Sequence, residues 1–253
     1  MVKENVGNVA QARKSFESVI DNPKYREIIR DDKHLEMLLD MIGTDVQGNI
    51  LDIGTGTGYL AFPLAEMFPK NEVTGIDITP QMIEKNTKKA IEERRRNIKF
   101  ISFDGIHYPF AEENFALITT RYAFHHFPDI EQRVEQISSL VKKGGYILVS
   151  DPIRAERDTK HVIDKFMAVK GDGHIQFYTA NEIEELFSAC GVFVEKEVIT
   201  DMKFPFPPKQ EYLDLFCELS EEEKAMYDMW EENHTVRVGN IQVANILLRR
   251  RNV

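Results

Sequence analysis

The order of apolar and polar segments along the chain predicts an α/β fold. Short apolar runs of strand length fall at 49–53, 72–77, 98–102, 115–120 and 145–150. Longer segments with apolar residues at three- and four-residue spacing, as in an amphipathic helix, fall at 59–68, 80–95 and 130–141. Strands that alternate with helices in this way form a parallel sheet with helices on both faces.

Further elements are expected on both sides of this alternating part. Residues 9–42 carry the helical spacing and Asn22-Pro23 interrupts it, so two helices are expected before the first strand. Beyond the fifth strand, the pattern predicts a helix at 180–189 and strands at 193–199 and 241–248. The stretch 204–238 is long for a connection between strands, and we expect it to be helical over 209–232.

A glycine-rich turn follows the first predicted strand. The strand Ile50-Leu51-Asp52-Ile53 runs into Gly54-Thr55-Gly56-Thr57-Gly58 and then into the helix at 59–68. Such a turn brings bare backbone close to a ligand at the helix N-terminus, and glycine permits both the close approach and positive φ. The spacing is not the dinucleotide pattern G-x-G-x-x-G, because Tyr59 stands where the third glycine would be. A phosphate loop would need Gly-Lys-Ser/Thr, which is absent. A dehydrogenase is therefore disfavoured.

Two acidic residues stand at the ends of the first two predicted strands. Asp77 ends the second predicted strand, where a carboxylate can accept hydrogen bonds from ribose hydroxyls. Asp52 precedes the glycines, which suits a ligand with a positive group better than a pyrophosphate. These residues predict a nucleoside ligand that carries a positive charge.

Composition narrows the class of protein. The net charge of −10 disfavours a nucleic-acid partner, because phosphate neutralisation needs a basic surface. No apolar run reaches about 18 residues, so no membrane span is expected, and the N-terminus lacks an apolar signal region. The two cysteines have neither metal-type spacing nor a disulfide framework. We expect a cytoplasmic protein.

The order of the motifs resembles a known family. Four segments resemble the successive motifs of class I S-adenosylmethionine-dependent methyltransferases: Ile50–Gly58, Val73–Asp77 followed by Met82, Phe103–Gly105 and Leu140–Asp151. The segment Arg121–Asp129 resembles the HHF-P-D/N segment of the ubiquinone/menaquinone-biosynthesis-type small-molecule methyltransferases. The resemblance extends over roughly residues 45–200. It implies a doubly wound, Rossmann-like sheet of seven strands, mostly parallel, with an antiparallel C-terminal hairpin, plus N-terminal helices and a helical insertion.

The resemblance also implies a cofactor, S-adenosyl-L-methionine, with S-adenosyl-L-homocysteine as its product. Asp52 and the glycine turn would hold its amino-acid end, Asp77 its ribose, and Asp104 its adenine amino group. The expected cofactor-binding residues are Asp52, Gly54, Thr55, Gly56, Gly58, Asp77, Ile78, Met82, Asp104, Gly105 and Arg121. Two of these acids have a simpler interpretation: Asp77 could cap the helix at 80–95, and Asp104 could be a turn residue.

Methyl transfer asks mainly for alignment and exclusion of water, and a base is needed only if the acceptor must lose a proton. His125 and His126 are the candidates for that base, and adjacent residues point in different directions, so at most one should face the pocket. The same geometry makes them a poor pair of ligands for one ion. Metal-dependent relatives place an acid after the fourth strand, and none stands here, so no metal is expected.

Contacts to the substrate are harder to assign. Arg121 follows an apolar strand and, if buried, would need a carboxylate partner from the cofactor, an acidic substrate or the protein itself. Further candidates for substrate contact are Tyr25, Arg154, His174 and Tyr178. Packing or an ordinary surface loop is the alternative for His174 and for Tyr25.

Three parts follow from these assignments. We expect an N-terminal helical cap at 1–45, a cofactor-binding methyltransferase domain made of 46–203 and 239–253, and a helical insertion at 204–238. The insertion would cover the active site, mediate a contact such as a homodimer, or be a surface excursion. The main hypothesis is methyl transfer to a small molecule, with the methylated atom unspecified. The alternatives are a protein or RNA acceptor, and a non-catalytic cofactor-binding scaffold.

Overall fold

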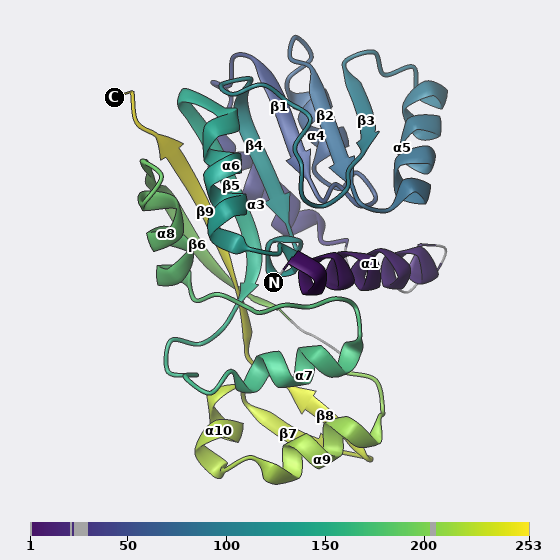
Figure 1. The fold of residues 1–253 in the computed structure, drawn as a ribbon, viewed down its shortest axis with the longest axis vertical. Helices are drawn as coiled ribbons and strands as arrows, with labels where there is room; N and C mark the ends of the chain where they lie inside the picture. Colours follow the sequence, from purple (N-terminus) through teal and green to yellow (C-terminus); the bar gives the residue numbers. More distant parts are fainter. Residues whose placement is uncertain (1, 21, 23–29, 203–205, 253) are drawn as a thin grey trace.

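A computed structural model describes residues 2–20, 22, 30–202 and 206–252 of the chain. A seven-stranded sheet in the order β3-β2-β1-β4-β5-β9-β6 forms its centre (Figure 1). The strands are β1 (Asn49–Ile53), β2 (Val73–Asp77), β3 (Ile98–Ser102), β4 (Phe115–Arg121), β5 (Val141–Ile153), β6 (Val192–Met202) and β9 (Ile241–Arg250). The first five are parallel, and β9 runs antiparallel between β5 and β6. This architecture confirms the predicted fold class.

Helices pack on both faces of this sheet because its central strands are apolar on both faces. Alternate residues of a strand point to opposite faces. Ile50 and Leu117 accordingly belong to one core cluster, whereas Leu51 and Ile118 belong to another. The first cluster packs against α3 (Asp32–Ile42), α4 (Ala61–Met67) and α5 (Pro80–Glu92), and the second against α6 (Ile130–Leu140) and α8 (Ala180–Ser188).

The first helix has a different position from all of these. α1 (Val2–Val19) crosses below the carboxyl ends of the parallel strands (Figure 1). Two glycines let it approach closely, because a Cβ at Gly105 would lie 2.9 Å from Val9 and one at Gly173 would lie 2.7 Å from Ala12. α1 therefore covers the edge of the sheet where ligands bind in open α/β folds.

A smaller group of elements lies beyond α1 from the sheet (Figure 1). It consists of α7 (Val162–Lys170), α9 (Gln210–Glu218), α10 (Glu221–Met226) and a hairpin of β7 (Met229–Glu232) and β8 (Thr235–Val238). These elements share one apolar core, in which Phe166 of α7 packs against Phe206 and Tyr212.

The hairpin corrects part of the predicted helix at 209–232. The first part is helical, as expected, but residues 229–232 form a strand. Asn233 and His234 both have positive φ, 52° and 57°, which is the backbone of a tight hairpin turn and breaks a helix. The alternation of Thr235, Val236, Arg237 and Val238 after this turn was the signal of the second strand. The sequence reading also missed α7.

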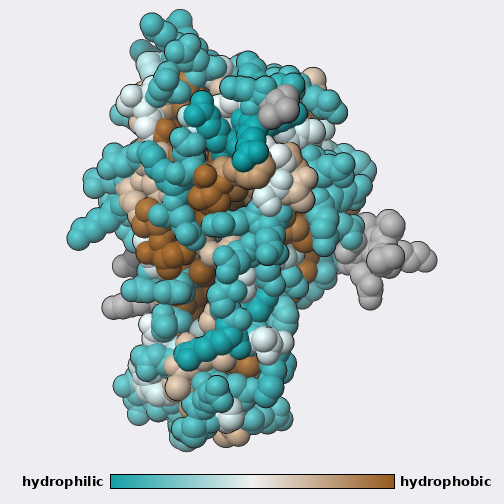
Figure 2. All heavy atoms as spheres, turned by 90° about the vertical axis from the view of Figure 1, so that its left-hand side faces the viewer, coloured by the Kyte–Doolittle hydropathy of each residue, from teal (hydrophilic) through white to brown (hydrophobic). Residues whose placement is uncertain are grey.

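The edge of the sheet formed by β6 carries exposed apolar side chains. β6 is an edge strand of the sheet, and its side chains Val194, Val198 and Ile199 are exposed. Figure 2 turns this side toward the viewer and shows apolar side chains among charged ones. Among the helices of the described residues, none has the length and apolar character needed to cross a membrane.

Candidate active site

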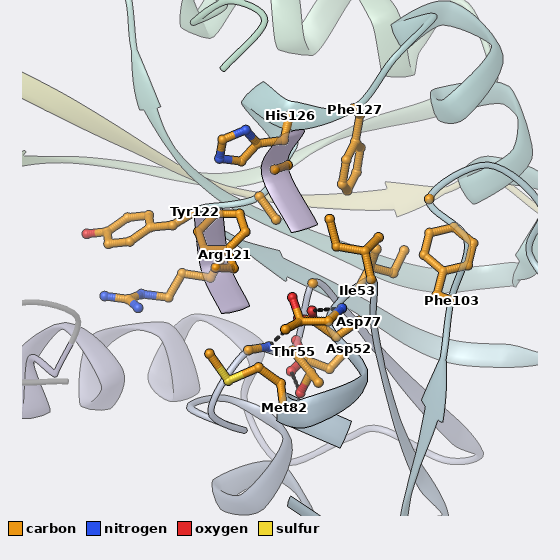
Figure 3. A pocket seen from close by; sticks show the side chains of 18 of the residues that line it. Asp52, Ile53, Thr55, Asp77, Met82, Phe103, Arg121, Tyr122, His126 and Phe127 are labelled. Carbon is orange, nitrogen blue, oxygen red and sulfur yellow. Dashed lines mark hydrogen bonds between the residues drawn. The ribbon is translucent and has the colours of Figure 1, made fainter. Parts of the chain in front are cut away.

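A cavity lies at the carboxyl ends of β1, β2 and β4, between the sheet and α1. The strand order reverses between β1 and β4, which is where doubly wound sheets open a crevice. Figure 3 shows Asp52, Thr55 and Asp77 at one end of this cavity and His126 and Phe127 at the other.

The glycine turn has the backbone that the sequence predicted. Gly54, Gly56 and Gly58 have φ of 67°, 50° and 77°, a region that favours glycine. A Cβ on Gly54 would lie 2.5 Å from the Cβ of Ala123, and one on Gly58 would lie 2.5 Å from Phe62. Gly54 and Gly56 line the cavity, whereas Gly58 allows the turn to pack on the following helix.

Asp77 joins the glycine turn to the start of α5. Its Oδ2 accepts a hydrogen bond from the Gly56 amide and its Oδ1 from the Thr79 amide, both at 2.8 Å. The N-cap of α5 is Thr79, so Asp77 is not the capping residue. Burial raises the pKa of Asp77. Each oxygen accepts one of these two bonds, and a carboxylate oxygen has capacity for a second, so Asp77 can also bind hydroxyls in the cavity.

Asp52 lies behind the turn and ties it to β4. Its two oxygens accept hydrogen bonds from the hydroxyls of Thr55 and Thr119, each at 2.7 Å. Asp52 is 2% exposed, and this burial raises the pKa of its carboxyl to about 6. Its first task is therefore to hold the shape of the turn.

His125 points away from the cavity into a buried acid–imidazole pair. Its Nδ1 lies 2.8 Å from Oδ2 of Asp151, and its backbone amide donates to the same oxygen at 3.1 Å. Burial lowers the pKa of His125 well below its ordinary value and raises the pKa of Asp151 to about 7. The pair fixes the short helix η1 (Phe124–His126) against β5.

His126 faces the cavity, as expected for one of two adjacent residues. Its ring meets Phe16 of α1 edge to face, with centroids 5.4 Å apart. Its Nδ1 is buried and has no hydrogen-bond partner among the described residues. Burial, with a contribution from His125, lowers the pKa of His126 to about 3. The imidazole is therefore neutral and can accept or donate one hydrogen bond in the cavity, but it is a weak base.

The structure brings most of the predicted cofactor residues together and leaves two outside, Gly58 and Asp104. Thr55, Ile78, Met82, Gly105 and Arg121 line the same cavity. Asp104 is exposed and does not line the cavity. Its Oδ1 accepts from the amides of Ile106 and His107 at 2.8 and 2.7 Å. These bonds belong to a turn, which was the simpler interpretation of this acid.

Three of the four predicted substrate contacts, Arg154, His174 and Tyr178, lie outside the cavity lining. Arg154 is buried and forms two hydrogen bonds, of 2.7 and 2.9 Å, to the carboxylate of Glu182. Tyr178 packs in the core against Phe124. His174 pairs with Asp164 through Nε2 at 2.7 Å and lies beside His125. Tyr25 lies outside the described residues. Among the described residues, no cluster of His, Cys, Asp and Glu could hold a metal ion.

Sequence reasoning missed the aromatic and apolar part of the lining. Val9, Ala12 and Phe16 of α1, together with Tyr59 and Phe103, complete the cavity. The three α1 residues lie at three- and four-residue spacing, the signal of one helix face, but the sequence does not say what that face covers.

The geometry defines a Rossmann-like domain with a cavity at the point where the strand order reverses, and comparison with known proteins gives the family. A family model described as "Methyltransferase domain" matches residues 44–191, more than half of the chain. The chain belongs to this family and is a methyltransferase, as the sequence motifs predicted.

Similar proteins agree with this assignment. The uncharacterized methyltransferase YcgJ of Bacillus subtilis is 28% identical over 176 residues, which cover 66% of this chain and 68% of the relative. The crystal structure of YcgJ from the same organism has a TM-score of 0.76 and 20% identity, and the match covers 88% of this chain and 100% of that one. Demethylmenaquinone methyltransferase of Thermus thermophilus is 35% identical over 100 residues, 40% of this chain. The chain spans only 45% of the length of that relative.

Proposed function

We propose that this methyltransferase uses S-adenosyl-L-methionine to methylate a small molecule. The observation that carries the proposal is a continuous cavity that joins Asp77 and the glycine turn at one end to aromatic side chains and His126 at the other. One end suits a nucleoside with an amino-acid group, and the other suits an organic acceptor.

The residues of the cavity fit the cofactor. Asp77 is buried and hydrogen-bonded on both oxygens, and it has acceptor capacity left for the ribose hydroxyls. Ile78 and Met82 offer apolar contact for the adenine, and the Gly54–Gly56 backbone comes close enough for the amino-acid end. When bound, the cofactor supplies an electrophilic methyl group on a sulfonium centre.

The acceptor would bind between α1 and η1. Phe16, Tyr122 and Phe127 surround His126 there, so an acceptor with an apolar or aromatic body is favoured. The name of the Thermus thermophilus relative specifies demethylmenaquinone as the substrate of that protein. We assign His126 to orient the acceptor by a hydrogen bond, and His125 with Asp151 to hold η1 in place.

Exclusion of water is the second contribution of the chain. α1 closes the cavity from the side opposite the strands, which supports an N-terminal cap. Inside such a site, a nucleophile loses its hydration and lies in line with the methyl group, and this alignment supplies most of the rate. A weak base such as His126 is adequate for an acceptor that loses its proton readily.

The insertion at 204–238 lies away from the cavity in the residues that the structure describes. No residue of this segment lines the cavity in the part of the chain that the structure describes. The segment packs instead with α7, so it offers no groove for a protein or RNA next to the reacting atoms. A small-molecule acceptor is therefore preferred to the macromolecular alternative.

Native mass spectrometry of the purified protein tests the proposal. We expect a retained mass matching S-adenosylmethionine or S-adenosylhomocysteine, or uptake of either when it is added. Calorimetric titration with S-adenosylhomocysteine gives the affinity. A folded protein that binds neither compound would overturn the proposal.

A further inference from the structure

Arg121 is half-buried, and its guanidinium lies between two aromatic rings. Its guanidinium lies 3.9 Å from the centre of the Tyr59 ring and 3.8 Å from that of Tyr122. Among the described residues, no carboxylate lies within ion-pair distance of it. The aromatic faces stabilise the cation without neutralising it.

Both rings of the clamp are held in place. The Tyr59 hydroxyl donates a hydrogen bond to the Asp31 carbonyl oxygen. Tyr122 has a φ of 55°, in the region that favours glycine, and its amide donates to the Ser150 carbonyl oxygen at 2.9 Å. A non-glycine residue is kept in this conformation only when its surroundings enforce it, and such positions cluster at functional sites.

A buried chain of hydrogen bonds fixes the third side of Arg121. The amide nitrogen of Asn245 donates to the Val198 carbonyl oxygen at 2.9 Å and to Thr200 Oγ1 at 3.1 Å, which sets the orientation of the amide. Its Oδ1 therefore faces His34 Nε2 at 2.8 Å, so Nε2 must carry the proton. His34 Nδ1 is then an acceptor, and Arg121 Nε donates to it at 3.4 Å.

We propose that Arg121, clamped by Tyr59 and Tyr122 and positioned by His34, is a carboxylate-binding site of the cavity. A guanidinium binds a carboxylate through two parallel hydrogen bonds, and only one of its five N–H groups is used by His34. This proposal rests on the proposed function, because the carboxylate has two sources in that reaction. One is the amino-acid end of the cofactor, since Tyr59 directly follows the glycine turn. The other is an acidic acceptor.

The tautomer of His34 makes this site sensitive to pH. The charged groups that act on His34 are Arg121 and Asp31. Asp31 also acts on Tyr59 and Tyr122, the two rings that stack on Arg121, and Asp151 acts on Tyr122. Protonation of His34 would place an N–H against Arg121 Nε–H and push the guanidinium from its position. Burial lowers the pKa of His34, so the neutral form is kept at neutral pH and lost only in more acidic solution.

Binding of two ligands to Arg121→Gln tests the site. S-adenosylhomocysteine has the carboxylate, and 5′-methylthioadenosine has the same nucleoside without the amino-acid end. If the cofactor is the source, the variant should bind S-adenosylhomocysteine about 10- to 100-fold more weakly and methylthioadenosine unchanged. Arg251→Gln is the matched control, because Arg251 also stacks on a ring, at 3.7 Å from the centre of Phe193, outside the cavity.

A second experiment tests whether the carboxylate that Arg121 binds belongs to the acceptor. Benzoate is added to protein saturated with S-adenosylhomocysteine, and binding is followed by NMR. Binding to the wild type that is lost in Arg121→Gln, with unchanged cofactor affinity, assigns the carboxylate to the acceptor. If the variant changes neither ligand, the proposal is overturned, while the proposed function stands as long as the wild type binds S-adenosylhomocysteine.

The role of His34 has its own readout. The wild-type preference for S-adenosylhomocysteine over methylthioadenosine should fall in acidic solution, over the pH range in which the NMR signals of the His34 ring show that it gains a proton. His34→Leu should show a weaker preference that no longer changes with pH, and His34→Asn, which offers an acceptor oxygen near the place of Nδ1, should restore part of it. Retained methylthioadenosine binding shows that each variant is folded. A wild-type preference that stays constant while His34 becomes protonated would exclude the positioning role.

Discussion

The carboxylate of Asp77 accepts a hydrogen bond of 2.8 Å from the backbone amide of Gly56, across two strand ends of the sheet. This bond joins the end of β2 to the glycine turn that follows β1. The residue expected to bind the ribose therefore also fixes the loop expected to bind the amino-acid end. A change at Asp77 should affect both parts of the cofactor site.

Replacement of Asp77 by alanine should weaken cofactor binding by about 1–3 kcal/mol, because charge-assisted hydrogen bonds to a carboxylate are lost. Calorimetric titration with S-adenosylhomocysteine measures this change. Asp77→Asn is the matched control: it keeps one acceptor oxygen and should retain part of the affinity. Equal affinity of the wild type and Asp77→Ala would mean that Asp77 serves only the local backbone.

Two glycines with similar positive φ allow the effect of the close approach in the turn to be isolated. Gly54 has φ of 67° and its added Cβ would meet Ala123 at 2.5 Å, whereas Gly191 has φ of 75° and open space around it. Gly191→Ala should lose about 1–2 kcal/mol of unfolding free energy from backbone strain alone. Gly54→Ala should lose more, because backbone or Ala123 must also move.

Urea denaturation of both variants measures this difference. The structure also predicts that Gly54→Ala loses cofactor affinity and that Gly191→Ala keeps it, since Gly191 is outside the cavity. Equal losses of stability in the two variants would show that the turn can relax around a methyl group.

The sheet could be predicted from the sequence because its strands are short apolar runs separated by amphipathic helices. The parallel strands are buried on both faces, and this makes them stand out from the helices around them. The hairpin at 229–238 was not recognised because Trp230 and the acidic residues beside it do not distinguish an exposed strand from a helix. Its turn lacks glycine, the usual signal, and uses Asn233 and His234 instead.

The sequence predicted the part of the candidate site that is formed by the glycine turn and the strand ends. It did not predict the part that depends on how distant segments pack together. The glycine turn and Asp77 follow from strand ends and spacing. Asp104 has the same place after a strand, but the neighbouring amides of Ile106 and His107 turn its carboxylate outward. The cover by α1 could not be predicted, because contact between Phe16 and His126 depends on the path of a chain over 100 residues long between them.

The buried carboxyl of Asp52 predicts a pH-dependent stability. Its pKa is raised by burial to about 6, so the folded protein holds a proton at pH values where the unfolded chain has already released it. The stability that this group contributes is present at low pH and is lost as the pH rises from about 4 to about 6. Asp52→Asn, which has no charge to bury, should not show this loss.

The unfolding free energy of Asp52→Asn relative to the wild type should therefore rise by up to about 2 kcal/mol between pH 4 and pH 7. Urea denaturation at several pH values measures both proteins side by side, so that all other titrating groups cancel. Parallel pH profiles of the two proteins would show that Asp52 titrates at the same pH in the folded and unfolded states.

His126 should stay neutral over the whole range in which an ordinary histidine titrates. Burial lowers its pKa to about 3, so its ring signals in an NMR titration should not move between pH 8 and pH 5. The signal that disappears in His126→Gln assigns the residue. The variant should bind S-adenosylhomocysteine with nearly unchanged affinity, because His126 lies at the end of the cavity opposite Asp77. A midpoint between pH 6 and pH 7 would instead make His126 an effective general base and would require that water or an acid reaches its ring.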